Sequence, residues 1–256
     1  MTKFIPYLAE EAIERDAAAL LAEYAQARGI TITPPIPIED IVEKHLKLRI
    51  EFDDTHKVFG IPRDSERDAD ILGMMYFDEA RIVIDESLDP EEYPSKEGRY
   101  RFTLAHEGGG HWRLHRHLFA KDPAQAVLFG GPVEPSVVCR SSQAKERVEL
   151  QADLYASCLL IPKDLLLSAW QERFGTIKAR ILKRKDRLTL PAGVNDEMAT
   201  AFQSFDQRCD DEALNEFVRP FSAKFQVSMV SMRIRLERLG LLHREVPRQH
   251  SFTSAG

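Results

Sequence analysis

Apolar residues recur at helical spacing in several segments of the chain. Residues 8–28 carry them at every third or fourth position, and the pattern stops at Gly29, a residue typical of helix C-caps. The segments 144–160 and 164–174 show the same periodicity, and a shorter helix is predicted over residues 38–45. Each long segment would bury one apolar face against the rest of the protein.

Other segments have the patterns of β-strands. Residues 46–52 ("LKLRIEF") alternate apolar and polar side chains, which predicts a half-buried strand. "ILGMMYF" (71–77) and "RIVID" (81–85), separated by a short turn, predict a β-hairpin. Residues 53–70 are expected to form a loop, and the chain after the helix that carries His106 is expected to be irregular up to about Ser142. The predicted fold class is therefore α+β, with a small β-sheet packed on helices.

The character of the chain changes after Gly175. Residues 178–187 ("KARILKRKDR") hold six basic side chains in ten, and an acidic segment follows. The last apolar segment, "FSAKFQVSMVSMRIRLERLGLL", predicts two short helices with a break at Gln226–Ser228. We therefore expect two domains: residues 1–170, and a helical C-terminal extension over residues 171–256 with a helix-turn-helix-like segment near 217–243.

Composition narrows the range of functions. The 256 residues carry a net charge of −6, which gives no general attraction to nucleic acid or to an anionic membrane. The three cysteines, Cys139, Cys158 and Cys209, form no CxxC pair, and no apolar run reaches the roughly 20 residues that span a bilayer. We expect a cytoplasmic protein with no membrane segment. The basic run is interpreted as a solvated surface, with contact to DNA or an acidic partner as the alternative.

One stretch carries candidate chemistry: "RFTLAHEGGGHWRLHRH", residues 101–117. It is close to the helical zinc signature HExxH, but three glycines separate Glu107 from His111. On a regular α-helix, residues five apart lie about 140° apart around the axis, too far for two histidines to reach one ion. A π-bulge of one turn would return His111 to the side of His106. Each of the three glycines destabilises a helix by roughly 1 kcal/mol relative to alanine. We would not expect three such residues in a helix that has only a packing role.

A catalytic zinc site needs a third protein ligand and one open position. Glu149, on the predicted helix "ERVELQAD", is the candidate third ligand, so the predicted metal ligands are His106, His111 and Glu149 with zinc (Zn2+) as cofactor. Asp153 lies one turn further on the same face and can accept the second N–H of a liganding histidine. Glu107 is the candidate catalytic base.

Two alternatives to this zinc site remain open from the sequence. The inserted residue abolishes the site and leaves a protein without catalytic activity, or the zinc pair shifts to His111 and His115, which are four residues apart. The second arrangement places Trp112 where the base should be, so it predicts metal binding with poor hydrolysis.

The two motifs "RFTLAHEGGGHWRLH" and "ERVELQADLYASCLLIP" resemble those of the ImmA/IrrE family of intracellular zinc metallopeptidases. The resemblance covers about residues 5–170 and implies a zincin-like metallopeptidase core followed by a small helical module. It implies a zinc endopeptidase whose partner is a protein substrate, typically a DNA-binding helix-turn-helix repressor of stress or mobile-element genes. The alternative is a catalytically inactive relative that binds a repressor or DNA without cutting it.

The resemblance also suggests how peptide hydrolysis would proceed. Glu107 would take a proton from water and return it to the leaving amine. A substrate could add as a strand to a sheet edge offered by the 71–85 hairpin. His115 and Tyr155 lie near the candidate ligands in sequence, and each is interpreted as structural, with stabilisation of the oxyanion as the alternative.

Overall fold

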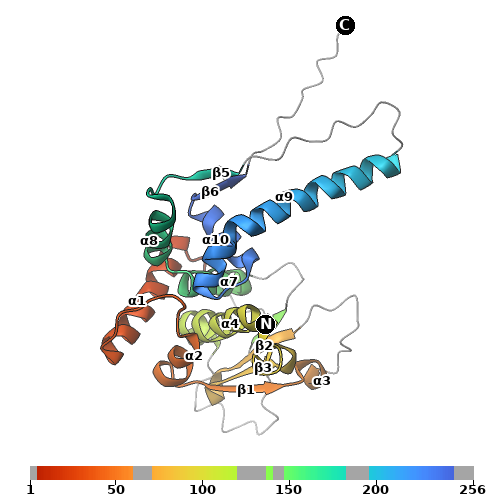
Figure 1. Ribbon diagram of the computed structural model, residues 1–256. Helices are drawn as coiled ribbons and strands as arrows, with labels where there is room; N and C mark the ends of the chain where they lie inside the picture. Colours follow the sequence, from red (N-terminus) through yellow and green to blue (C-terminus); the bar gives the residue numbers. More distant parts are fainter. Residues whose placement is uncertain (1–4, 60–70, 120–136, 141–146, 183–195, 245–256) are drawn as a thin grey trace. The chain divides into compact units, whose positions relative to one another are not determined.

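A computed structural model describes five segments of the protein: residues 5–59, 71–119, 137–140, 147–182 and 196–244 (Figure 1). The described chain is a mixed α+β structure, as predicted. It divides into two compact units, one of residues 1–166 with 223–228 and the other of residues 167–222 with 229–256. Within the described segments, no helix has both the length and the apolar character needed to cross a membrane.

The first unit contains a four-stranded sheet with the order β1-β3-β2-β4. Strand β1 is parallel to β3, and β2 is antiparallel to both β3 and β4. The strands are β1 (Arg49–Asp53), β2 (Ile71–Tyr76), β3 (Arg81–Asp85) and β4 (Val137–Arg140). The predicted hairpin is confirmed as β2 and β3, whereas β4 lies in a stretch that was expected to be irregular.

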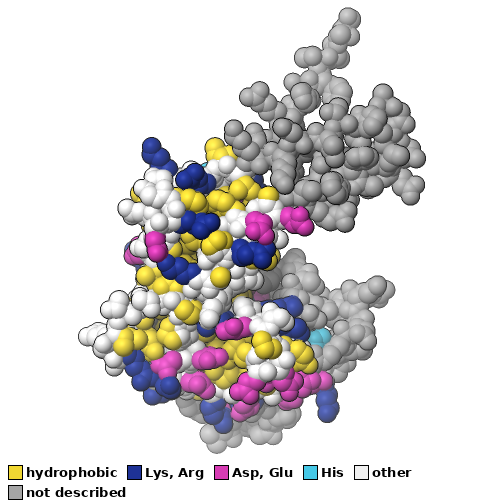
Figure 2. Space-filling model, in the orientation of Figure 1, with side chains coloured by type: hydrophobic (Ala, Val, Ile, Leu, Met, Phe, Trp, Pro, Cys, Tyr) yellow, Lys and Arg dark blue, Asp and Glu magenta, His cyan; other side chains and the backbone are white. Residues whose placement is uncertain are grey.

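The position of the hairpin in the sheet corrects the expectation that it offers a free edge. Both of its strands are internal, and among the described strands β1 and β4 form the edges. Strand β1 is accordingly less buried than its alternation predicted, because Phe52 is 38% exposed although it packs on Tyr100. Figure 2 shows acidic side chains gathered over this part of the unit, where charges protect an edge strand from pairing with other chains.

Helices of the first unit cover one face of the sheet, and Figure 1 shows α4 and α7 on the same side of the strands. Their bounds are α1 (Glu10–Arg28), α2 (Ile38–Asp40), η1 (Ile41–His45), α3 (Thr55–Phe59), α4 (Glu97–Ala105), η5 (His106–His115), α5 (Arg116–Phe119) and α7 (Arg147–Leu160). Short 3-10 turns are η2 (Phe77–Glu79), η3 (Glu86–Leu88) and η4 (Pro94–Lys96). The predicted end of α1 is confirmed, since Gly29 caps it in the left-handed conformation with φ 64°.

One short helix was not expected. Residues 53–70 were predicted to form a loop, but α3 occupies residues 55–59, and residues 60–70 lie outside the described chain. Thr55 at its start is fully buried, and its hydroxyl lies 2.7 Å from the Asp85 carboxylate at the end of β3. A polar contact between two separate segments stabilises this helix, and no local sequence pattern signals such a contact.

The second unit has an aromatic core built on α8 (Lys163–Phe174) and α9 (Asp196–Phe225). Trp170 stacks on Phe221 with ring centroids 5.5 Å apart, and Phe174 stacks on Phe217 at 5.8 Å. The unit also contains α10 (Met229–Arg238) and a two-stranded parallel sheet of β5 (Arg180–Leu182) and β6 (Leu242–Arg244).

Two expectations for the C-terminal part are changed by these elements. The predicted break at Gln226–Ser228 is confirmed, but the helix before it is 30 residues long and not short. Part of the basic run forms β5, where the Arg180 guanidinium lies 4.6 Å over the Phe174 ring. Residues 183–187 of that run, and the side chains of Cys139 and Cys209, lie outside what the structure describes.

The three glycines of η5 are packing residues, which corrects the expectation that packing alone would not call for them. A Cβ at Gly110 would lie 2.5 Å from the Cα and Cβ atoms of Ala152 in α7. A Cβ at Gly109 would lie 2.8 Å from the Tyr155 ring, and one at Gly108 would lie 2.7 Å from a methyl of Val42 in η1. The π-helix therefore approaches the α7 backbone at Gly110, whereas at Gly108 and Gly109 it packs closely on side chains.

We predict that alanine is tolerated very differently at two of these glycines. Gly110→Ala places a methyl against the α7 backbone, so it should lower the free energy of unfolding by at least about 2 kcal/mol. Gly108→Ala meets a methyl of the buried Val42 and no backbone atom, and it gains helix propensity, so its loss should be smaller, about 1 kcal/mol. Urea unfolding of both variants measures the difference, and equal effects would contradict this account of the packing.

Candidate metal centre

The histidines of the HEGGGH motif are brought together by a π-helix. Element η5 continues α4 and runs for ten residues, from His106 to His115, so the predicted single-turn bulge is in fact a longer segment. Five-residue spacing in a π-helix places His111 beside His106, with ring centroids 4.7 Å apart and the rings nearly perpendicular. Both rings are fully buried. The π-helix therefore accommodates the inserted glycine and keeps the two histidines side by side.

Glu149 on α7 completes a three-residue group. Its Oε2 lies 3.2 Å from His106 Nε2, and its Oε1 lies 3.4 Å from His111 Nε2. The ligand atoms of the three side chains all lie within 4.8 Å of one another, so the group can hold a metal ion. Within the described part of the chain this is the one such group of histidine, cysteine or carboxylate side chains. We call it the metal group.

Two polar atoms of the metal group lack the hydrogen bonds that burial normally requires. His111 Nε2 and Glu149 Oε2 are buried and have no hydrogen-bond partner among the described residues. The nearest polar atom of the group is Glu149 Oε1 for the first and His106 Nε2 for the second. Buried polar atoms without partners are rare in proteins and point to an ion or water. Two imidazole nitrogens and one carboxylate also match the ligand set of a catalytic zinc site with one open position. The residues present therefore fit a metal.

Charge supports the same interpretation. Burial raises the pKa of the Glu149 carboxyl, but the two adjacent histidines outweigh burial and hold this pKa well below its usual range. Burial lowers the pKa of His111 to about 4, although Glu149 opposes this shift. At neutral pH the group thus offers an ionised carboxylate and a neutral imidazole, which are the forms that bind a cation.

Asp153 has the supporting role expected from its position on α7. Its Oδ1 lies 3.0 Å from His106 Nδ1, one helical turn beyond Glu149. A carboxylate can only accept here, so the proton lies on His106 Nδ1 and the lone pair of Nε2 faces the metal group. The Asp153 contact fixes both the orientation and the tautomer of the first ligand.

The alternative zinc pair of His111 and His115 does not match the geometry. His115 is not part of the metal group, and its Nδ1 lies 3.3 Å from His111 Nδ1, the nitrogen that points away from Glu149. Its Nε2 lies 2.9 Å from Gln151 Oε1. The His115 ring is buried and contacts His111 on the side away from Glu149, which agrees with the structural role expected for His115.

Glu107, the candidate base, is buried beside the metal group. Both of its oxygens are without hydrogen-bond partners among the described residues, and burial raises its pKa to about 8. It is pressed against β2 at Gly73, where a Cβ would lie 2.8 Å from Glu107 Oε1. Sequence reasoning missed Gly73, although a glycine inside a strand pattern is the signal for such a close approach.

Helix α1 holds the outer side of η5 through a separate polar cluster. Arg113 donates to Asp16 at 3.2 Å and to Glu23 at 2.7 Å and 2.9 Å. The Tyr155 hydroxyl donates to the same Asp16 carboxylate at 2.8 Å. Tyr155 therefore ties α7 to α1, so its hydroxyl is engaged away from the metal group and the residue is structural, as interpreted.

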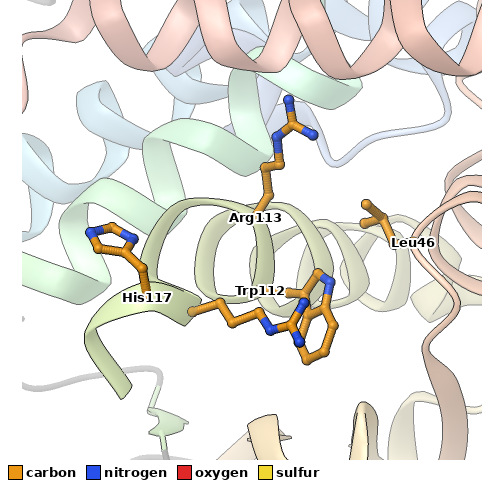
Figure 3. Close-up of a pocket in the computed structure, with 5 residues that line it drawn as sticks. Leu46, Trp112, Arg113 and His117 are labelled. Atoms are coloured by element: carbon orange, nitrogen blue, oxygen red, sulfur yellow. The ribbon is translucent and has the colours of Figure 1, made fainter. Parts of the chain in front are cut away.

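A pocket of about 440 Å³ opens beside η5 and α5, and Figure 3 shows its lining. Arg113 points toward α1, whereas Trp112 projects from the other side of η5. The Arg116 guanidinium lies 4.1 Å over the Trp112 ring, and Leu46 and His117 complete the lining. Among the described residues that line this pocket, none belongs to the metal group, so the pocket and the metal group are separate sites.

Comparison with known proteins does not assign the chain to a family. No protein-family model matches the sequence, and no curated protein matches it significantly. The geometry of the metal group therefore carries the functional argument.

We predict that the chain binds one zinc ion and that its ligands are required. His106→Ala and Glu149→Gln should each abolish binding, because two remaining ligands hold zinc poorly. Zinc at about 100 times its dissociation constant should raise the free energy of unfolding of the wild type by about 3 kcal/mol and leave both variants unchanged. Elemental analysis and thermal unfolding measure these effects.

Glu216→Gln is the matched control, because Glu216 is an exposed glutamate of α9 in the other unit. It should bind zinc like the wild type. Full zinc binding by Glu149→Gln would exclude Glu149 as a ligand.

Proposed function

We propose that the protein is a zinc-dependent endopeptidase with a zincin-like core, related to the ImmA/IrrE metallopeptidases that its motifs resemble. One observation carries the proposal: His106, His111 and Glu149 converge on one point despite the altered histidine spacing. A buried glutamate directly follows the first ligand in the chain, which is the order of base and ligand in the HExxH motif.

Zinc is the metal that this ligand set favours. Imidazole nitrogens suit zinc and other transition metals, whereas calcium and magnesium prefer sites built of oxygen atoms alone. Three protein ligands leave a fourth position for water or substrate. When bound, zinc would polarise that water and the carbonyl group of the scissile peptide bond.

Glu107 is the residue that would move the proton. Its two unpartnered oxygens leave one free to accept a proton from the attacking water and to hand it to the amine nitrogen as the C–N bond breaks. The high pKa of the buried Glu107 carboxyl makes it a strong acceptor. A cation at the metal group would favour its ionised form, which a base needs.

The substrate class rests on the resemblance and on the topology of the sheet. The resemblance suggests a protein substrate inside the cell, with a DNA-binding repressor as the partner. Strand β4 pairs with β2, the strand on which Glu107 packs, and β4 is an edge among the described strands. An extended peptide added at β4 would lie next to the strand that supports the base.

We predict that Glu107→Gln separates metal binding from proteolysis. The variant keeps all three ligands, so its zinc content should equal that of the wild type, while the rate of peptide cleavage should fall by about 100-fold or more. Cleavage of a helix-turn-helix repressor from the same genome, followed by mass spectrometry, gives the rate.

An endopeptidase and a non-catalytic regulator give opposite results in this assay. Zinc-loaded wild type that binds the repressor without cutting it, and matches Glu107→Gln in every assay, would favour a non-catalytic regulator. Cleavage by Glu107→Gln at the wild-type rate would remove Glu107 from the mechanism.

A further inference from the structure

The second metal ligand, His111, is supported differently from the first. His106 has the Asp153 carboxylate on its far side, and an ionised carboxylate can only accept a hydrogen bond. His111 has another histidine: its Nδ1 faces His115 Nδ1 at 3.3 Å, and both rings are buried. Two facing nitrogens form a hydrogen bond only when one of them carries a proton and the other does not.

The position of that single proton decides whether His111 can bind a metal. With the proton on His111 Nδ1, a neutral His111 has a free lone pair on Nε2, directed at Glu149. With the proton on His115 Nδ1, a neutral His111 must carry its own proton on Nε2, which blocks the ligand atom. The histidine pair alone is symmetrical and does not choose between these states.

Gln151 on α7 breaks the symmetry. Its side-chain Nε2 donates to the Pro6 carbonyl oxygen at 2.9 Å, and a carbonyl can only accept, so the orientation of the amide is fixed. Gln151 Oε1 therefore faces His115 Nε2, at 2.9 Å, and accepts a hydrogen bond from its N–H. A neutral His115 with its proton on Nε2 has a bare Nδ1, which accepts from His111 Nδ1–H.

We propose that Pro6, Gln151 and His115 form a hydrogen-bonded chain that sets the tautomer of His111 and so presents its Nε2 to the metal. His115 and Gln151 are positioning residues in this account, because they act through His111. The inference rests on the proposed metal site and adds a second support for it, built from neutral groups where Asp153 provides a charged one. It also gives the segment before α1 a role, since the Pro6 carbonyl is the fixed end of the chain.

The tautomers can be measured directly in the zinc-loaded protein, because without metal the Glu149 carboxylate, 3.4 Å away, would itself attract a proton to His111 Nε2. Two-bond 15N–1H NMR of histidine side chains distinguishes a proton on Nδ1 from one on Nε2. We expect His111 to carry its proton on Nδ1 and His115 on Nε2. A spectrum of that protein with His115 protonated on Nδ1 would overturn the proposal whatever the metal affinity.

Metal affinity tests the consequence through variants of the full chain. His115→Leu removes the acceptor behind His111, and Gln151→Leu removes the acceptor behind His115. Each should weaken zinc binding by about 10- to 100-fold in competition with a chromophoric chelator, the usual effect of losing such a supporting partner. His115→Asn places an oxygen near the former Nδ1 and should recover most of the affinity.

His117→Leu is the matched control, because it makes the same substitution at an exposed histidine two residues away. It should bind zinc like the wild type. Gln151→Leu keeps the test valid if His115→Leu fails to fold, since it leaves both histidines in place. Unchanged affinity in folded His115→Leu and Gln151→Leu, with zinc still bound by the wild type, would overturn the chain and leave the proposed metal site intact.

Failure of the proposed metal site itself can also be recognised. A wild type that binds no zinc would refute the metallopeptidase, while the NMR signals of His115 would still show whether its proton lies on Nε2, toward Gln151.

Discussion

The backbone approach of η5 to α7 at Gly110 and Ala152 is the constraint on which the metal group depends. Glu149 and His111 belong to these two different elements, and their ligand atoms meet only because no side chain separates the helices at this point. A π-helix and three glycines act together here. The wider winding turns His111 toward α7, and the missing side chains let α7 come close enough to supply a carboxylate.

Support for the site comes from three sides, and each uses a different kind of interaction. Strand β2 supports Glu107 at Gly73, where no side chain intervenes, so the Glu107 carboxyl group is positioned by van der Waals contact. Helix α1 holds Arg113 through two carboxylates on the outer side of η5. Helix α7 supplies the acceptor that orients His106. The first of these supports leaves the carboxyl group without hydrogen bonds, and burial then keeps its pKa high.

Local pattern was sufficient for much of this structure. The helix ending at Gly29, the hairpin, the α7 helix and the break at Gln226–Ser228 all follow from periodicity and capping, which depend on neighbouring residues. The three members of the metal group were predicted because the two histidines and Glu107 nearly match a zinc motif and a glutamate follows on a later amphipathic helix. Contacts between distant segments were not predictable in this way. Gln151 does not differ from an ordinary helix residue until its partner 145 residues away is known. Gly73 signals a close approach because it lies inside a strand, but its sequence context does not reveal that Glu107, more than 30 residues later, makes the contact.

The ten-residue π-helix has a consequence for finding related proteins. A motif search that requires two residues between the histidines rejects this chain, although His106 and His111 lie side by side as such a motif demands. A more informative pattern would allow a third residue, require glycine before the second histidine, and ask for a small residue three positions after the distant glutamate, where Ala152 stands. Sequences that share this pairing of small residues would be candidates for the same widened helix, including some dismissed as having lost their metal.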